Sequence, residues 1–134
     1  MKALALDLGR ARTGVAVTDP SGTIARPLPV IHHIDGPDGA AALDALLAEH
    51  SPEVVVVGKP LLMSGEAGEQ AHHASSFAGR LRARVDCPVV LADERMSTTE
   101  AERRARESGS SADIDSLAAC IILEAWLRGQ AAAA

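Results

Sequence analysis

Short hydrophobic runs near the N-terminus alternate with polar breaks in a pattern typical of strands. Residues 2–7 (KALALD) and 13–19 (TGVAVTD) are apolar or alternating runs separated by Gly9 and a polar turn, which predicts a β-hairpin. A third run over residues 24–33 extends the pattern. We therefore predict a meander of three strands at the start of the chain.

The middle of the chain switches to helical spacing and then to a fully apolar strand. Residues 36–39 contain two glycines that break the pattern, and residues 40–50 (AAALDALLAEH) carry apolar positions at helical spacing. The run EVVVVG at 53–58 holds four consecutive valines. Such a run is typical of a central parallel strand that is buried on both faces.

The second half repeats the alternation of helices and strands and ends in an apolar helix. The predicted elements are a loop over residues 61–68, a helix over 70–85, a strand over 88–92, a charged helix over 98–107, a connection over 107–112 and a largely buried helix over 113–128. We predict one α/β domain over residues 1–130, with a five-stranded mixed sheet and helices on both faces, and a frayed alanine tail over 131–134.

Composition limits the functions that this fold could carry. The 134 residues suffice for one domain, and one Phe, one Trp and no Tyr leave little material for stacking nucleic-acid bases. The formal net charge of −5 argues against a protein that coats nucleic acid by bulk electrostatics. It argues less against a metal-dependent nuclease, because bound divalent cations cancel acidic charge where phosphate approaches.

Other composition features indicate a cytoplasmic protein. No apolar stretch approaches the roughly 18 to 20 residues that span a bilayer, and Asp7 interrupts the N-terminal run where a signal peptide would stay apolar. Cys87 and Cys120 lack the spacing of a zinc or redox motif, so we expect reduced, structural thiols.

Three acidic segments are candidates for chemistry, and the first follows the first strand. Asp7 ends that strand and Gly9 allows a tight turn after it. This places a carboxylate at the sheet edge, where a metal could bind. An equally weighted alternative is that Asp7 only accepts backbone hydrogen bonds in the turn.

The second and third segments hold Glu94 and Asp115. Glu94 directly follows the last strand, at the end where open α/β sheets bind ligands, although Ser97 or Thr98 nearby could cap the next helix as well. Asp115 lies in the first turn of the last helix, on the stripe that faces the interior. The alternative is that Asp113 caps this helix and Asp115 only complements its dipole.

Together these acids would form a metal site at one end of the sheet. Two divalent ions about 3.5 to 4 Å apart, which activate a water and neutralise the leaving oxygen, need such a set of hard oxygen ligands. The reaction that this arrangement favours is hydrolysis of a phosphodiester bond.

The chain resembles the YqgF/RuvX family of pre-16S rRNA nucleases and Holliday-junction-resolvase-like proteins. The resemblance covers almost the whole chain and rests on DLGRARTGVAVTD, IARPLPVI, VVVGKPLLMSGEAGEQA, ADERMSTTEAE and DIDSLAACIILEAWL. It implies a ribonuclease H-like fold and Mg²⁺ or Mn²⁺ chemistry at an acidic triad of Asp7, Glu94 and Asp115.

The resemblance also implies basic residues that contact nucleic acid or steady the carboxylates, namely Arg12, Arg26 and Arg95. Two departures from the family pattern affect the substrate rather than the triad. The loop before the last acid is short and carries Asp113 where the family commonly has Lys. The segment after the valine strand has Lys59, Leu62 and Ser64 where the family often has Leu, Asn and Asp.

The leading hypothesis is a nuclease that processes the 5′-end of pre-16S ribosomal RNA. The alternatives are a Holliday-junction resolvase or other DNA nuclease, and a catalytically silent nucleic-acid-binding module. An ATPase of the actin and hexokinase type would need a second domain. A homodimer would suit symmetric junction cleavage, but no sequence feature demands it.

Overall fold

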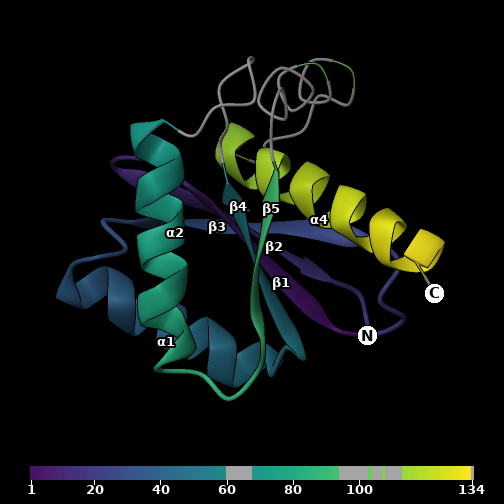
Figure 1. Ribbon diagram of the computed structural model, residues 1–134, viewed down its shortest axis with the longest axis horizontal. Coiled ribbons are helices and arrows are strands. Elements are labelled where there is room, and N and C mark those ends of the chain that lie inside the picture. Colours follow the sequence, from purple (N-terminus) through teal and green to yellow (C-terminus); the bar gives the residue numbers. More distant parts are fainter. Residues whose placement is uncertain (60–67, 94–102, 104–106, 108–112, 134) are drawn as a thin grey trace.

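In the part of the chain that the structure describes, a five-stranded sheet lies between two helices on one face and one helix on the other (Figure 1). This computed structural model describes residues 1–59, 68–93, 103, 107 and 113–133. The strands and helices are β1 (Ala3–Leu8), β2 (Arg12–Thr18), β3 (Ala25–His32), α1 (Pro37–His50), β4 (Val54–Lys59), α2 (Glu69–Arg82), β5 (Val89–Asp93) and α4 (Ile114–Ala133).

The sheet is mixed, as predicted, and has the order β3-β2-β1-β4-β5. The meander β1-β2-β3 is antiparallel, whereas β4 runs parallel to both β1 and β5. Helices α1 and α2 supply the crossovers that parallel neighbours require. The three parallel strands β1, β4 and β5 therefore end at the same edge of the sheet.

Alternating side chains of the central strands build two cores. Leu4, Leu6, Val55 and Val57 face α1 and α2, where they pack in one cluster with Phe77 and others. Their neighbours along β1 and β4 pack against α4 in a second cluster, which includes Ala3, Ala5, Val54, Val56, Ile122 and Leu123. All four valines of β4 are buried, which confirms that this strand is covered on both faces.

The helix ends differ from the sequence prediction. Helix α1 begins at Pro37 rather than at residue 40, because proline fits the first helical position, where the missing N–H would have had no helical partner. Helix α4 continues to Ala133 instead of ending near Arg128. The predicted loop over 61–68 and helix over 98–107 lie almost wholly outside the described residues.

Two predictions from composition can be compared with the structure. Both cysteines are free, Cys87 half-buried and Cys120 buried. Within the described ranges, no helix combines the length and the apolar character that crossing a membrane requires.

Candidate active site

The ends of the parallel strands bring acidic residues to one edge of the sheet. Asp7 is the one residue of β1 that is not fully buried. Two strands away, β5 ends at Asp93, opposite Lys59 of β4. Glu94 and Arg95 lie outside the described residues, but Asp93 immediately precedes Glu94, so the chain reaches Glu94 from the edge that carries Asp7.

Gly14 connects Asp7 to the third predicted acid. It is the register partner of Asp7 on β2. A Cβ atom placed on Gly14 would lie 1.9 Å from the backbone oxygen of Asp115 and 2.2 Å from its carbonyl carbon. Only glycine permits the backbone of α4 to approach a strand this closely. The structure therefore brings the strand position of Asp7 and the first turn of α4 together.

Asp113 caps α4, as the alternative interpretation of this segment in the sequence analysis predicted. Its Oδ1 accepts a hydrogen bond from the backbone N–H of Asp115 at 2.8 Å, and its carbonyl oxygen accepts the N–H of Leu117 at 3.0 Å. Both contacts are those expected of an N-cap residue. Because Asp113 fills this role, the side chain of Asp115 is not needed to cap the helix.

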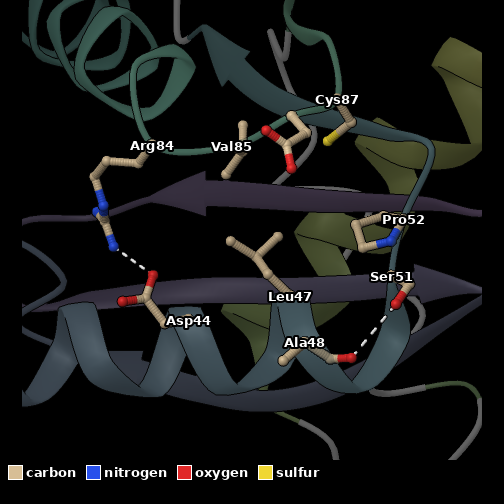
Figure 2. Close-up of a pocket in the computed structure, with 9 residues that line it drawn as sticks. Asp44, Leu47, Ala48, Ser51, Pro52, Arg84, Val85 and Cys87 are labelled. Atoms are coloured by element: carbon tan, nitrogen blue, oxygen red, sulfur yellow. Dashed lines mark hydrogen bonds and ion pairs between the residues drawn. The ribbon is translucent and has the colours of Figure 1, made fainter.

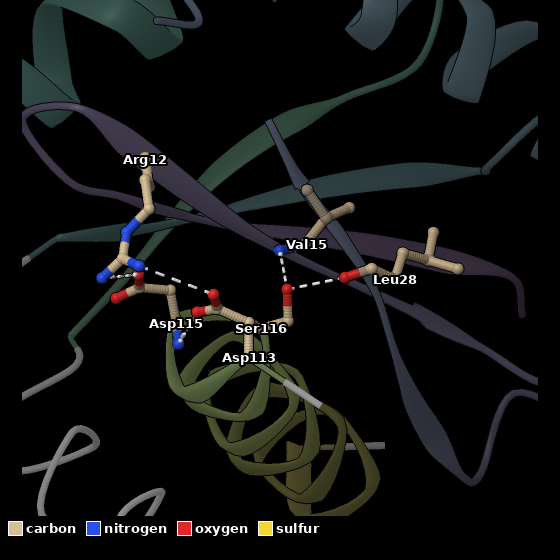
Figure 3. A network of polar contacts seen from close by, with 6 residues as sticks. All are labelled: Arg12, Val15, Leu28, Asp113, Asp115 and Ser116. Carbon is tan, nitrogen blue, oxygen red and sulfur yellow. Dashed lines mark hydrogen bonds and ion pairs between the residues drawn. The ribbon is translucent and has the colours of Figure 1, made fainter. Parts of the chain in front are cut away.

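Arg12 holds the two acids of the α4 N-terminus from the side (Figure 3). Its guanidinium nitrogens lie 3.1 Å from Oδ2 of Asp115 and 3.7 Å from Oδ2 of Asp113. The Asp115 side chain is 31% exposed, and that of Arg12 is 54% exposed. The expectation that Arg12 steadies the carboxylates is consistent with these contacts.

The electrostatics of Asp115 favour an additional cation. Burial raises the pKa of its carboxyl, the neighbouring Asp113 raises it further, and Arg12 opposes the rise. The ionised carboxylate is therefore incompletely compensated by protein groups alone. Carboxylate oxygens of this kind are the donors that Mg²⁺ and Mn²⁺ prefer.

The described residues do not by themselves complete a metal centre. Across residues 1–59, 68–93, 103, 107 and 113–133, no group of three or more His, Cys, Asp or Glu side chains is arranged to hold an ion. This count omits Glu94, the predicted third ligand. Asp7 and Asp115 fit a divalent ion by donor type, and Glu94 is the residue that would complete the set.

Ser116 fixes α4 against the sheet, a role that the sequence analysis missed (Figure 3). Its buried hydroxyl accepts the N–H of Val15 at 3.2 Å and donates to the carbonyl of Leu28 at 2.7 Å. Val15 and Leu28 are register partners beside a bulge between β2 and β3. The sequence gives little signal for this role, because Ser116 follows Asp115 directly and reads as one more polar residue at the start of the helix.

Of the other two predicted basic residues, Arg95 lies outside the described residues and Arg26 lies farther from the acidic site than Arg12. Arg26 is exposed on β3 and pairs with Val17, three positions along β2 from Gly14, or about 10 Å at the usual rise of a strand. Its contact with nucleic acid stays a prediction.

A hollow at the opposite end of the sheet is separate from this site (Figure 2). It has a volume of about 460 Å³ and lies between the end of α1 and the segment that leads into β5. An ion pair between Arg84 and Asp44 borders it. It lies at the end where β5 begins, whereas Asp7 lies where the parallel strands finish.

Solved structures that share this arrangement of strands and helices include Holliday-junction resolvases. The fowlpox virus resolvase, solved with its junction DNA, matches with a TM-score of 0.59 at 9% identity, over 97% of this chain and 99% of that chain. The RuvC protein of T. thermophilus, also solved with a junction, matches with a TM-score of 0.55 at 19% identity, over 98% and 96% of the two chains. The fold is thus the ribonuclease H-like fold of these resolvases.

Sequence comparison narrows the class to one family. The family model described as "RuvX: Holliday junction resolvase" matches residues 1–129. This chain belongs to the RuvX family. A relative from Anaeromyxobacter sp. (strain Fw109-5), named "Putative pre-16S rRNA nuclease", is 44% identical over 97% of this chain and 98% of its own length. A Synechococcus relative with the same name is 41% identical over 93% of this chain and 82% of its own length.

Proposed function

We propose that this protein is a divalent-metal-dependent nuclease that hydrolyses phosphodiester bonds with Asp7, Glu94 and Asp115. The observation that carries the proposal is the contact at Gly14, which lays the backbone of Asp115 against the β2 residue that pairs with Asp7. Two carboxylates distant in sequence are thereby held at one edge of the sheet, and Glu94 follows the strand β5 that ends at that edge.

The residues of the chain have distinct roles in this proposal. Asp7, Glu94 and Asp115 would hold Mg²⁺ or Mn²⁺, with two ions as the expected number. When bound, such ions lower the pKa of an attacking water and stabilise charge on the leaving oxygen. Arg12 orients the carboxylate of Asp115 through the contact at 3.1 Å. Asp113 and Ser116 position the helix that carries Asp115.

The proposed substrate is pre-16S ribosomal RNA, which the protein would process at its 5′-end in the cytoplasm. Several relatives between 39% and 44% identical to this chain are named "Putative pre-16S rRNA nuclease", which supports the RNA as substrate. A second candidate is cleavage of branched DNA, which is favoured by the family description and by the junction-bound resolvases of the same fold. A homodimer would suit the second candidate, since two symmetric cuts match a twofold enzyme.

The test is cleavage of labelled substrates by the purified protein. A pre-16S RNA spanning the mature 5′-end, an unrelated single-stranded RNA, a single-stranded DNA and a four-way junction are each incubated with Mg²⁺, Mn²⁺ or chelator. We expect metal-dependent cleavage of the pre-16S RNA near the mature end. If only the four-way junction is cleaved, branched DNA and not pre-16S RNA is the substrate. Binding without cleavage of any substrate would indicate a silent binding module and overturn the proposal.

A further inference from the structure

A small hollow adjoins the turn between β1 and β2. It has a volume of about 310 Å³ and is lined by Arg10, Asp35, Glu69, Gln70 and His73. This volume is at the lower end of the roughly 300 to 1,000 Å³ typical of ligand pockets. Its residues come from the β1–β2 turn, from the segment before α1 and from the first turns of α2.

The β1–β2 turn connects the hollow to the acidic site. The N–H of Gly9 donates to the carbonyl of Arg12 at 2.9 Å, which closes the turn that contains Arg10. Arg12, at the end of this turn, contacts Asp115, whereas Arg10 lines the hollow. The hollow and the acidic site are therefore joined by one short turn, in which Arg10 and Arg12 are two residues apart.

One side of the hollow is held in place by an ion network. Asp35 accepts contacts from Nε2 of His73 at 3.1 Å and from a guanidinium nitrogen of Arg80 at 3.0 Å. Arg80 also donates to the hydroxyl of Ser76 at 2.8 Å. These contacts tie α2 to the segment before α1, so this wall is formed before a ligand arrives.

Gln70 provides an acceptor that the protein does not use. Its Oε1 atom is buried and has no hydrogen-bond partner among the residues that the structure describes. A buried carbonyl without a donor is costly, so such a group in a native protein calls for an explanation, and a ligand donor is one. Glu69 adds a second acceptor to the lining. The lining of the hollow therefore includes residues with acceptor side chains, and Arg10 supplies a cation.

We propose that this hollow binds one nucleobase of single-stranded RNA next to the cleaved bond, with Gln70 accepting a hydrogen bond from an exocyclic amino group and Arg10 contacting the adjoining phosphate. Unstacked bases of single strands are commonly read by hydrogen bonds to their edges. Cytosine carries a donor amino group at the position where uracil carries an acceptor oxygen. The inference rests on the proposed function, because it assumes that nucleic acid is the substrate.

The test compares binding of 12-nucleotide oligocytidylate and oligouridylate, measured by fluorescence anisotropy in chelator and low salt so that no cleavage occurs. We expect the unmodified protein to bind oligocytidylate more tightly. The variant Gln70→Met, which keeps the shape and removes the acceptor, should bind oligocytidylate about 5- to 10-fold more weakly and no longer distinguish the two RNAs. Its Tm should not fall, because an unpaired buried carbonyl has been removed. The matched control is Gln130→Met, at an exposed position of α4.

A second variant keeps the inference testable if Gln70→Met folds poorly. Arg10→Gln should weaken the binding of both RNAs by the same factor, because a phosphate contact is lost. Arg128→Gln, at an exposed position of α4, should leave the binding of both RNAs unchanged. Unchanged affinity in Gln70→Met, or equal binding of both RNAs by the unmodified protein, would overturn the inference. If binding depends on Gln70 but no substrate is cleaved with Mg²⁺ or Mn²⁺, the proposed nuclease function fails and this site stands.

Discussion

Gly14 lies where the first turn of α4 meets β2, and its missing side chain determines how closely the two acids of the site can approach. The backbone oxygen of Asp115 lies where a Cβ atom would be. A side chain here cannot be accommodated by a rotamer change, because both contacting groups are backbone. The geometry of the acidic site therefore depends on one hydrogen atom in place of a methyl group.

The variant Gly14→Ala tests this dependence. We expect it to lower the free energy of unfolding by about 2 to 3 kcal/mol, as overpacking of a closed contact does, and to abolish cleavage by displacing Asp115. Chemical denaturation and the cleavage assay measure the two effects. The control is Gly79→Ala in α2, where a Cβ would meet nothing within 4 Å. Helix propensity predicts that this control gains up to about 1 kcal/mol. Full activity of Gly14→Ala would refute the role given to this contact.

Helix α4 is joined to the sheet through Ser116 at a place where the β2–β3 ladder is irregular. The hydroxyl bridges the N–H of Val15 and the carbonyl of Leu28, and no water can replace it easily, because Ser116 is fully buried. The same helix turn carries Asp115. The packing of this element thus determines where one ligand of the site lies.

Ser116→Ala should destabilise the protein by about 1 to 3 kcal/mol, because it leaves two buried backbone groups without their partner. Thermal and urea unfolding report the change. Ser76→Ala provides the comparison, since Ser76 is exposed on α2 and its hydroxyl accepts a hydrogen bond from the exposed Arg80. This variant should stay within about 0.5 kcal/mol of the unmodified protein. Equal losses of unfolding free energy in the two variants would show that the hydrogen bonds of Ser116 do not stabilise the protein more than an exposed hydroxyl does.

Helix α2 is tied to the segment before α1 through Asp35. Burial tends to raise the pKa of this carboxyl, but hydrogen bonds and charge from His73 and Arg80 outweigh it, so the pKa is lowered from its usual 3.8. The folded state therefore releases this proton more readily than the unfolded state. The ionised Asp35 therefore stabilises the folded protein above about pH 3.8. This stabilisation is lost as the pH falls through the lowered pKa of Asp35 in the folded state.

Asp35→Asn should accordingly cost about 0.5 to 1 kcal/mol at neutral pH, a modest figure because the Asp35 side chain is 52% exposed and screened by solvent. The difference from the unmodified protein should shrink as the pH falls below 3.8. Urea titrations at pH 7, 5 and 3 measure it, with Asp86→Asn, exposed before β5, as the charge-matched control. A loss that stays constant across this range would contradict the assignment.

Both edges of the sheet carry features that oppose pairing with another chain. Edge strand β3 contains Pro27 and Pro29, which cannot donate to a ladder. On edge strand β5, the side chain of Arg82 donates from Nε to the carbonyl of Val89 at 3.0 Å. Since the neighbouring carbonyl of Pro88 bonds to β4, that of Val89 faces outward. A homodimer built by strand addition is therefore disfavoured, and dimerisation itself stays a prediction.

The elements that could be predicted from sequence are those with local patterns. The meander and the valine strand follow from periods of hydrophobicity over a few residues, and the structure confirms both. The predicted start of α1 was wrong, because Gly36 and Gly39 suggested a break in a segment where Pro37 in fact occupies the first helical position. The bridge from Ser116 to Val15 joins residues 101 positions apart, and no local pattern reveals such a contact.

For the whole molecule, the topology explains how an acidic protein could act on nucleic acid. The net charge of −5 is unfavourable for binding a polyanion. Parallel strands β1, β4 and β5 finish at one edge, and α4 begins there, so part of the acidic charge is concentrated where divalent ions could neutralise it. The three acids were predicted from sequence to share an edge. The structure places Asp7 and Asp115 there, and Glu94 stays a prediction.

The most direct test of the metal-site assignment compares two neighbouring acids of α4. Asp113→Asn and Asp115→Asn make the same change in charge two residues apart, and asparagine is as good an N-cap as aspartate, so both should fold. Cleavage of labelled pre-16S RNA with Mn²⁺ is measured for both variants and for Asp7→Asn. We predict that Asp7→Asn and Asp115→Asn lose at least about 100-fold in rate, or roughly 2.7 kcal/mol, while Asp113→Asn stays active. An active Asp115→Asn beside an inactive Asp113→Asn would contradict the account.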